Sequence, residues 1–321
     1  MSVVWTLQSE DVARIRFAFS PSWELGASLR TLRDPARQAV HLPWITAVRP
    51  RLAELDLTEL FALVPPSGYM VDFITPPPDT PLPDFATELA RIRATPPEAA
   101  YAEAGQVTSL DPAAIARFQA DPVAGVARVA DTLERYWQSC LAEFWPRVRG
   151  LLERDVLLRS RELAANGAHG LFAALDPAIS WTGSQLIVER QSCGQTLPGG
   201  DGLVLVPSAF YWPSVAVMVP PYQPMVVYPV NGVGTLWAQG PPPAPGALAA
   251  LIGASRARIL LALAEPATTT ALAGRMELTP GAVSQHLKVL AGGGLAVGRR
   301  LGKEVVYRRT PTGDALVRSS R

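Results

Sequence analysis

Side chains whose types and spacing suit binding to a polar surface gather near the C-terminus of this 321-residue chain. In residues 280–291, Val283, Leu287 and Leu290 recur at i, i+4 and i+7, which predicts a helix with one buried stripe. Thr279 is the predicted N-cap, and it is followed by proline at the first helical position. Small and polar side chains then fall outside the stripe, where they can approach nucleic-acid base edges and phosphates. They are Pro280, Gly281, Ser284, Gln285 and Lys288.

A basic hairpin is predicted directly after this helix. Residues 292–294 are all glycine and end the helix, and residues 295–301 and 305–309 read as two strands around Gly302-Lys303. Phosphate neutralisation supplies much of the affinity of a protein for DNA, so a ribbon rich in basic side chains suits contact with a duplex. The basic side chains of this ribbon are Arg299, Arg300, Lys303, Arg308 and Arg309.

A short helix over residues 270–276 and a tight turn at 277–278 precede the polar helix, which completes the order of a helix-turn-helix with a wing. The run TTTALAGRMELTPGAVSQHLKVLAGGGLAVGRRLGKEVVYRRTPTGDAL resembles the winged helix-turn-helix of the ArsR/SmtB transcriptional regulators. The resemblance covers about 75 residues. It implies that Ser284, Gln285, His286 and Lys288 lie on the recognition helix and that Arg299, Arg300 and Lys303 lie on the wing. Thr279 and these seven residues are the predicted DNA-binding set.

The same resemblance implies a homodimer that pairs through the helices flanking the motif and binds double-stranded DNA. Metal-sensing members carry cysteines before the turn or histidines on the last helix, but residues 268–276 contain no cysteine and residues 312–321 contain no histidine. We therefore expect no metal and no cofactor. The long region before the motif departs from compact members and resembles regulators of actinobacterial type whose corresponding region is uncharacterised.

The elements before residue 240 predict an α+β domain. Apolar and capping patterns indicate a series of short helices, of which the longest segment spans residues 131–166 with Pro146 as a kink or break. From residue 179 to 237 the pattern changes to short β-branched runs separated by glycine and proline, which predicts a small antiparallel β-meander. A proline-rich linker follows at residues 238–246. We therefore predict an effector-sensing or dimerisation domain over residues 1–240 and a winged helix-turn-helix domain over residues 246–321.

The formal charge of the whole chain, +1, conceals a division between these domains. Residues 246–321 carry 11 basic and 4 acidic side chains, or +7, whereas residues 1–245 carry 18 and 24, or −6. Residues 202–255 hold no charged side chain and 10 prolines. Prolines at this density exclude a membrane-spanning helix. The stretch could line a ligand pocket or form a dimer interface, and the sequence does not separate the two.

The function expected from these patterns is a DNA-binding transcriptional regulator, a dimeric repressor controlled by a small-molecule effector. Two cysteines without a disulfide framework and the absence of a signal peptide favour the cytoplasm. Residues 1–240 contain no Ser/His/Asp, metal or nucleotide motif, so we expect no enzymatic activity. Two alternatives remain at this point: an N-terminal enzyme tethered to DNA, or a protein-interaction module without a ligand.

Overall fold

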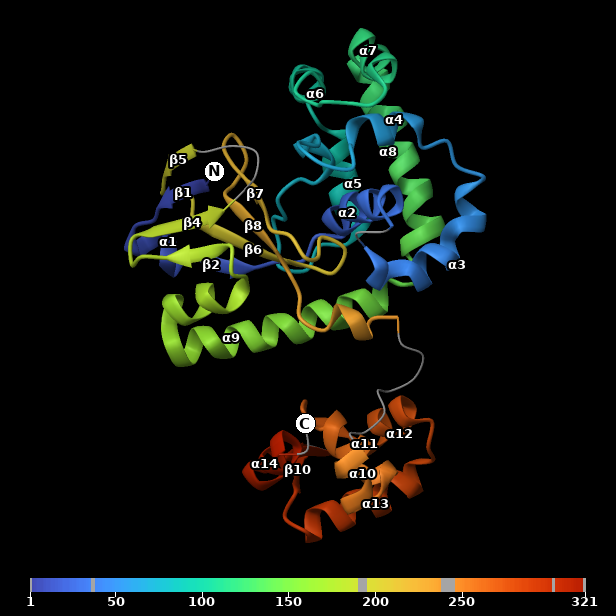
Figure 1. Cartoon of the computed structure of the whole chain (residues 1–321), viewed down its shortest axis with the longest axis vertical. Helices are drawn as coiled ribbons and strands as arrows, with labels where there is room; N and C mark the ends of the chain where they lie inside the picture. Colours follow the sequence, from blue (N-terminus) through green and yellow to red (C-terminus); the bar gives the residue numbers. More distant parts are fainter. Residues whose placement is uncertain (1, 36–37, 190–194, 238–245, 302–303, 320–321) are drawn as a thin grey trace. The chain divides into compact units, whose positions relative to one another are not determined.

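The computed structural model describes residues 2–35, 38–189, 195–237, 246–301 and 304–319. The chain divides into two compact units, Met1–Trp237 and Ala238–Arg321 (Figure 1). Both helices and strands are prominent, so the α+β class is confirmed. The predicted linker, residues 238–246, lies outside the described residues except for Gly246.

The N-terminal unit contains helices that begin where the sequence supplies caps. The side chains of Ser20, Asp84, Asp111 and Asp121 each accept a hydrogen bond from a first-turn N–H, which satisfies a donor that has no partner within its helix. The helices are α1 (Ser9–Ala13), α2 (Pro21–Arg33), α3 (Leu42–Leu52), α4 (Thr58–Leu63), α5 (Phe85–Arg93), α6 (Pro97–Ala104), α7 (Pro112–Ala120), α8 (Pro122–Tyr136) and α9 (Trp145–Leu175).

The long helical segment predicted over residues 131–166 is divided in the structure. A π-helical turn at Trp137–Leu141 separates α8 from α9. Pro146 lies in the first turn of α9, where its missing N–H costs no hydrogen bond. Gly167, with φ 64° and ψ −164°, turns the chain inside α9. Glycine suits this conformation because it has no Cβ to clash.

Strands of the N-terminal unit form two four-stranded sheets. One has the order β3-β4-β1-β5 and the other β2-β6-β8-β7. The strands are β1 (Ser2–Thr6), β2 (Ile15–Phe17), β3 (Ile179–Trp181), β4 (Gln185–Glu189), β5 (Gln195–Pro198), β6 (Leu203–Ser208), β7 (Ala216–Met218) and β8 (Met225–Pro229).

The predicted antiparallel meander over residues 179–237 is therefore wrong. These residues are divided between two sheets, and each sheet takes a further strand, β1 or β2, from the start of the chain. The pairs β2–β6, β6–β8 and β1–β5 are parallel, whereas β3–β4, β1–β4 and β7–β8 are antiparallel. Local alternation indicates that a strand exists but does not specify its partner. The partners of β1 and β2 are remote in sequence.

The sheet that contains β6 and β8 is buried on both faces. Val204, Val206 and Val227 pack into the larger core with α2–α8, while Leu205 and Val226 pack against β1, β4 and the end of α9. A strand covered on both faces reads as a continuous apolar run. Burial of β6, β7 and β8 thus explains most of the uncharged stretch in residues 202–229.

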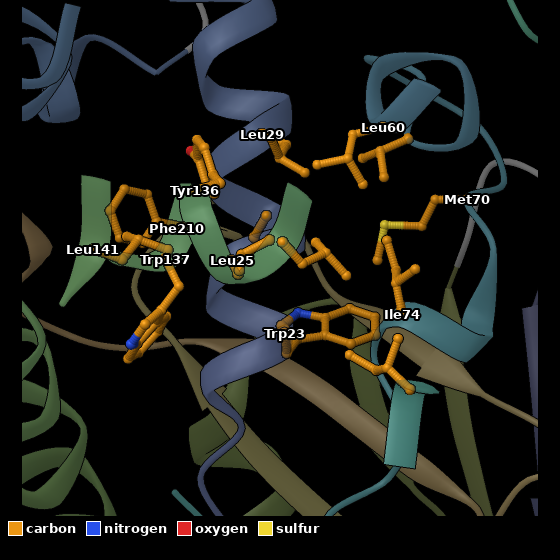
Figure 2. Close-up of a cluster of buried hydrophobic side chains, with 14 of the residues drawn as sticks. Trp23, Leu25, Leu29, Leu60, Met70, Ile74, Tyr136, Trp137, Leu141 and Phe210 are labelled. Carbon is orange, nitrogen blue, oxygen red and sulfur yellow. The ribbon is translucent and has the colours of Figure 1, made fainter. Parts of the chain in front are cut away.

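The larger core of the N-terminal unit is built around α2 (Figure 2). Trp23, Leu25 and Leu29 of this helix lie among side chains from α4, α8 and the segment after β6. A buried polar bridge within this core joins Ser28 Oγ of α2 to Tyr136 Oη of α8 at 2.8 Å. Burying both hydroxyls without this bond would leave polar groups unsatisfied in an apolar setting.

Among the described helices, none is both long and apolar enough to cross a bilayer.

The C-terminal unit contains five helices and three short strands within the described residues. They are α10 (Gly246–Ile252), α11 (Ala254–Ala262), β9 (Ala267–Thr268), α12 (Thr269–Met276), α13 (Pro280–Gly292), β10 (Ala296–Leu301), β11 (Glu304–Arg309) and α14 (Pro311–Ser319).

Candidate nucleic-acid interface

Helices α12 and α13 are joined by a turn of three residues. Thr268 caps α12 by accepting from Ala271 N at 3.2 Å, and Glu277 ends it in the left-handed conformation at φ 57°. Leu278 N then donates to Ala273 O at 3.1 Å. Thr279 accepts from Ala282 N at 3.3 Å and begins α13. These local hydrogen bonds help to fix one helix relative to the other.

The inward face of α13 is the stripe that the sequence predicts. Val283, Leu287 and Leu290 are buried in a core shared with α10, α11, α12 and α14. Burial of these three side chains determines which face of the helix meets solvent, since side chains three or four positions apart lie on one side.

Polar side chains occupy the outward face of α13. Gln285 and Lys288 are exposed, and Ser284 and His286 are partly exposed at the two edges of the buried stripe. The Thr279 hydroxyl is engaged as the helix cap, although the residue is exposed at the helix start. Glutamine can read adenine through its side-chain amide, and lysine can bind a guanine edge or a phosphate.

The sequence analysis did not select Val289, whose side chain is 53% exposed beside Gln285 and Lys288 on the same helix. An exposed apolar side chain on a base-reading surface can contact the methyl group of thymine. The signal was present in the sequence, because Val289 falls outside the i, i+4, i+7 stripe.

The hairpin after α13 separates its arginines onto two faces. Strands β10 and β11 pair antiparallel, with Arg299 opposite Val306, Val297 opposite Arg308 and Arg300 opposite Val305. Side chains alternate along a strand, so Arg299 and Arg308 share one face and Arg300 lies on the other. Arg299, Arg300 and Arg308 are exposed. Lys303, the remaining predicted wing residue, lies outside the described residues.

Arg309 differs from the other wing arginines because its Nε lies 2.9 Å from Asp314 Oδ1 of α14. This ion pair ties the base of the hairpin to the last helix. By the strand register, Arg308 is the arginine of β11 that shares a face with Arg299. Arg308 is not in the predicted DNA-binding set, because the sequence alone does not give this register.

Gly298 lies opposite Tyr307 in the same hairpin. A Cβ at Gly298 would come within 2.9 Å of Tyr307 Cε1, closer than van der Waals contact allows. The tyrosine ring thus lies over the glycine, and the pair holds the hairpin against the core of the unit.

Comparison with known protein families agrees with this geometry. Residues 251–299 match a family model described as a helix-turn-helix domain. Residues 98–234 match a model described as a family of unknown function (DUF5937). No curated protein and no solved structure matches the chain. The C-terminal unit is therefore a DNA-binding domain of helix-turn-helix type that carries a wing, and it is attached to a region similar to a family of unknown function.

Proposed function

We propose that this protein is a sequence-specific transcriptional regulator of ArsR/SmtB type that binds double-stranded DNA. Helix α13 enters the major groove with Gln285 and Lys288 toward the base edges, and Arg299 and Arg308 of the wing bind phosphates. The observation that carries the proposal is the polar outward face of α13. This helix is capped at Thr279 and is followed by a basic hairpin, and both lie in the region with a charge of +7.

We further propose that the protein acts as a homodimer and as a repressor. The resemblance to ArsR/SmtB regulators supports this proposal, and Leu251 of α10, a helix that flanks the motif, is 68% exposed and thus available for such a contact. Two copies would place two recognition helices on half-sites about one helical turn of DNA apart.

The N-terminal unit, in this proposal, controls the DNA-binding unit by binding a small-molecule effector and not by catalysis. Five of its acidic side chains are buried, and each accepts a hydrogen bond from a backbone N–H of another segment or turn. This use of carboxylates supports the fold of the unit.

The test is a titration of the full chain against its own upstream DNA and against scrambled DNA of equal length at several salt concentrations. We expect a preference for the upstream duplex of about 10³-fold or more and a linear fall of log affinity with log salt. Equal affinity for the two duplexes, or an affinity indifferent to salt, would contradict the proposal.

Substitution on α13 sharpens this test. Gln285→Ala removes an exposed amide without touching the buried stripe, so we expect the ranking of operator variants to change at one position by about 1–3 kcal/mol. Glu265→Gln, in the loop before α12, is the matched control and should leave the ranking unchanged. An unchanged ranking in the Gln285→Ala variant would remove this residue from base reading.

A further inference from the structure

A cavity of about 1100 Å³ opens on the N-terminal unit between α2 and one end of the strands β3 and β4. Its lining residues come from α2, from the segments 66–68 and 210–215, and from the ends of β3 and β4, where Asp176 and Glu189 lie. This volume is large enough for a small organic molecule. We call this cavity the α2 crevice.

The walls of the α2 crevice differ in chemistry. Tyr211 lies on the aromatic wall, with its ring 5.7 Å from that of Trp23 in an edge-on arrangement. Arg30 of α2 donates to Gly68 O at 2.7 Å and to Tyr211 Oη at 3.4 Å, so its guanidinium belongs to this wall. Pro213 adds apolar surface, whereas the ring of Phe210 is fully buried. A flat apolar ring fits such a wall.

Two further lining residues, Asp176 and Glu189, carry carboxylates. Glu189 N donates to Ala178 O at 2.8 Å, and Ala178 N donates to Asp176 Oδ1 at 2.9 Å. These bonds place Asp176 and Glu189 at the same end of the β3–β4 pair. Among the described lining residues, three acidic side chains accompany one basic side chain, which favours a cationic ligand.

The aromatic wall is held from behind by buried polar groups. The Glu24 carboxylate accepts from Ala209 N at 3.0 Å and from Phe210 N at 3.1 Å. His41 Nε2 lies 3.2 Å from Ala209 O, and the His41 ring stacks on Phe210 with centroids 4.5 Å apart. The position of Phe210 is thus coupled to that of the His41 ring.

His41 also holds the residue at which the chain leaves the N-terminal unit. Trp237 Nε1–H donates to His41 Nδ1 at 2.9 Å, so His41 is neutral and its proton lies on Nε2, where it donates to Ala209 O. Burial lowers the pKa of His41 to about 4, in agreement with a neutral ring. Trp237 is the last residue of the N-terminal unit, and its ring packs on Trp44, Phe144 and Phe210.

We propose that the α2 crevice binds a small organic amine with a flat apolar ring, and that Tyr211, through its chain neighbour Phe210 and His41, transmits its occupancy to Trp237. The amine binds Asp176 and Glu189, and the ring packs on Tyr211 and Pro213, since the ring of Phe210 is fully buried. Trp237 precedes the DNA-binding unit in the chain, so a shift of its anchor changes the start of the connection to that unit. The ligand site stands on the crevice alone, whereas its regulatory output rests on the proposed function.

The experiment uses the full chain labelled with ¹⁵N at its tryptophan indoles, without DNA. The probe is phenethylamine, and 3-phenylpropanoate, which has a similar ring and chain but a negative charge, is its control. We expect phenethylamine to shift the Trp237 indole N–H resonance, assigned from the Trp237→Phe variant, with a Kd on the order of 1 mM. The Asp176→Asn, Glu189→Gln double variant should weaken this binding about tenfold or more, whereas Glu98→Gln, on an exposed position of α6, should not.

Three results would overturn the proposal. One is the absence of any shift up to about 10 mM phenethylamine, ten times the expected Kd. The second is equal binding of phenethylamine and 3-phenylpropanoate, or undiminished binding in the double variant while its other indole resonances retain their positions. The third is a response of other indoles without Trp237, which would refute transmission. None of these results depends on DNA, so failure of the regulator proposal in the DNA titration would be recognised separately.

Discussion

The two units of this chain place their charges in opposite ways. The N-terminal unit buries five carboxylates, and each accepts at least one backbone N–H, as Glu24 does from Ala209 and Glu103 does from Phe73. In the described part of the C-terminal unit, no charged side chain is buried, and the core consists of apolar residues. Its arginines lie mostly on the surface, at the wing and along the helices.

This difference indicates how each unit is made. A carboxylate buried among backbone donors ties together segments far apart in sequence: Asp11, for example, accepts from Gly200 N and Gly202 N. The C-terminal unit is built from helices that are neighbours in sequence. Its charged side chains lie mostly at the surface, where they can make electrostatic contacts. The N-terminal unit should therefore respond to pH through its core, and the C-terminal unit to salt through its surface.

The largest expected effect separates the stability of the two units. Leu287→Ala leaves a cavity at a fully buried position of α13, which should cost about 2–5 kcal/mol and abolish DNA binding. Because all eight tryptophans precede residue 238, tryptophan fluorescence follows the N-terminal unit alone, whereas far-ultraviolet circular dichroism follows both units. In urea titrations, only the dichroism transition should move.

The control for this prediction is Val289→Ala, at a 53% exposed position of the same helix, which should change stability by less than about 0.5 kcal/mol. If the fluorescence transition of the Leu287→Ala variant shifted as much as the dichroism, the two units would not be independent in stability.

The second effect concerns the buried acids. Burial raises the pKa of Glu88 to about 7 from an ordinary value of 4.5. Between these values the folded unit keeps a proton that the unfolded chain releases, so the contribution of Glu88 to stability is fully present below pH 4.5 and is lost as pH rises through 7. The loss is roughly 3 kcal/mol for this group. Glu88→Gln cannot ionise and retains an acceptor for Ser22 N, so it should flatten the decline.

Urea denaturation followed by tryptophan fluorescence at pH 5 and pH 8 measures this difference. The exposed Glu98→Gln variant is the control and should keep the wild-type dependence on pH. An equally steep decline in the Glu88→Gln variant would show that another group, such as Glu24, dominates, since burial raises the pKa of Glu24 to about 7 as well.

The third effect tests the faces of the wing. Arg299→Ala should weaken binding to every duplex by about tenfold and reduce the slope of log affinity against log salt by about 1. Arg309→Ala is the matched change: its guanidinium is paired with Asp314, so its loss should have a smaller effect on the salt slope. Equal effects in the two variants would argue against the separation of wing faces that follows from the strand register.

The smallest expected effect is on the start of the recognition helix. Thr279→Ala removes the hydroxyl that accepts from Ala282 N, which should destabilise the C-terminal unit by about 1 kcal/mol. Thr279→Ser keeps this oxygen and should restore most of the loss in thermal melts followed by circular dichroism. If serine and alanine were equally destabilising, the methyl group and not the cap would be responsible.

Much of the C-terminal unit could be predicted from the sequence. Its buried stripe, the cap at Thr279 and the order of helix, turn, helix and hairpin depend on residues a few positions apart, and such local patterns carry the helical period directly. The separation of Arg299 and Arg308 from Arg300 could not be predicted, because one position of strand register exchanges the faces.

In the N-terminal unit, fewer features could be predicted from the sequence than in the C-terminal unit. The sequence by itself indicated a series of short helices and the short apolar strands after residue 179, because propensity and capping act within a few residues. Only the tertiary structure decided that β1 and β2 join sheets formed near residue 200, and that His41 binds both Ala209 and Trp237. Those partners lie more than 150 residues apart, and their pairing depends on the total burial of apolar surface and buried polar groups, which no local pattern encodes.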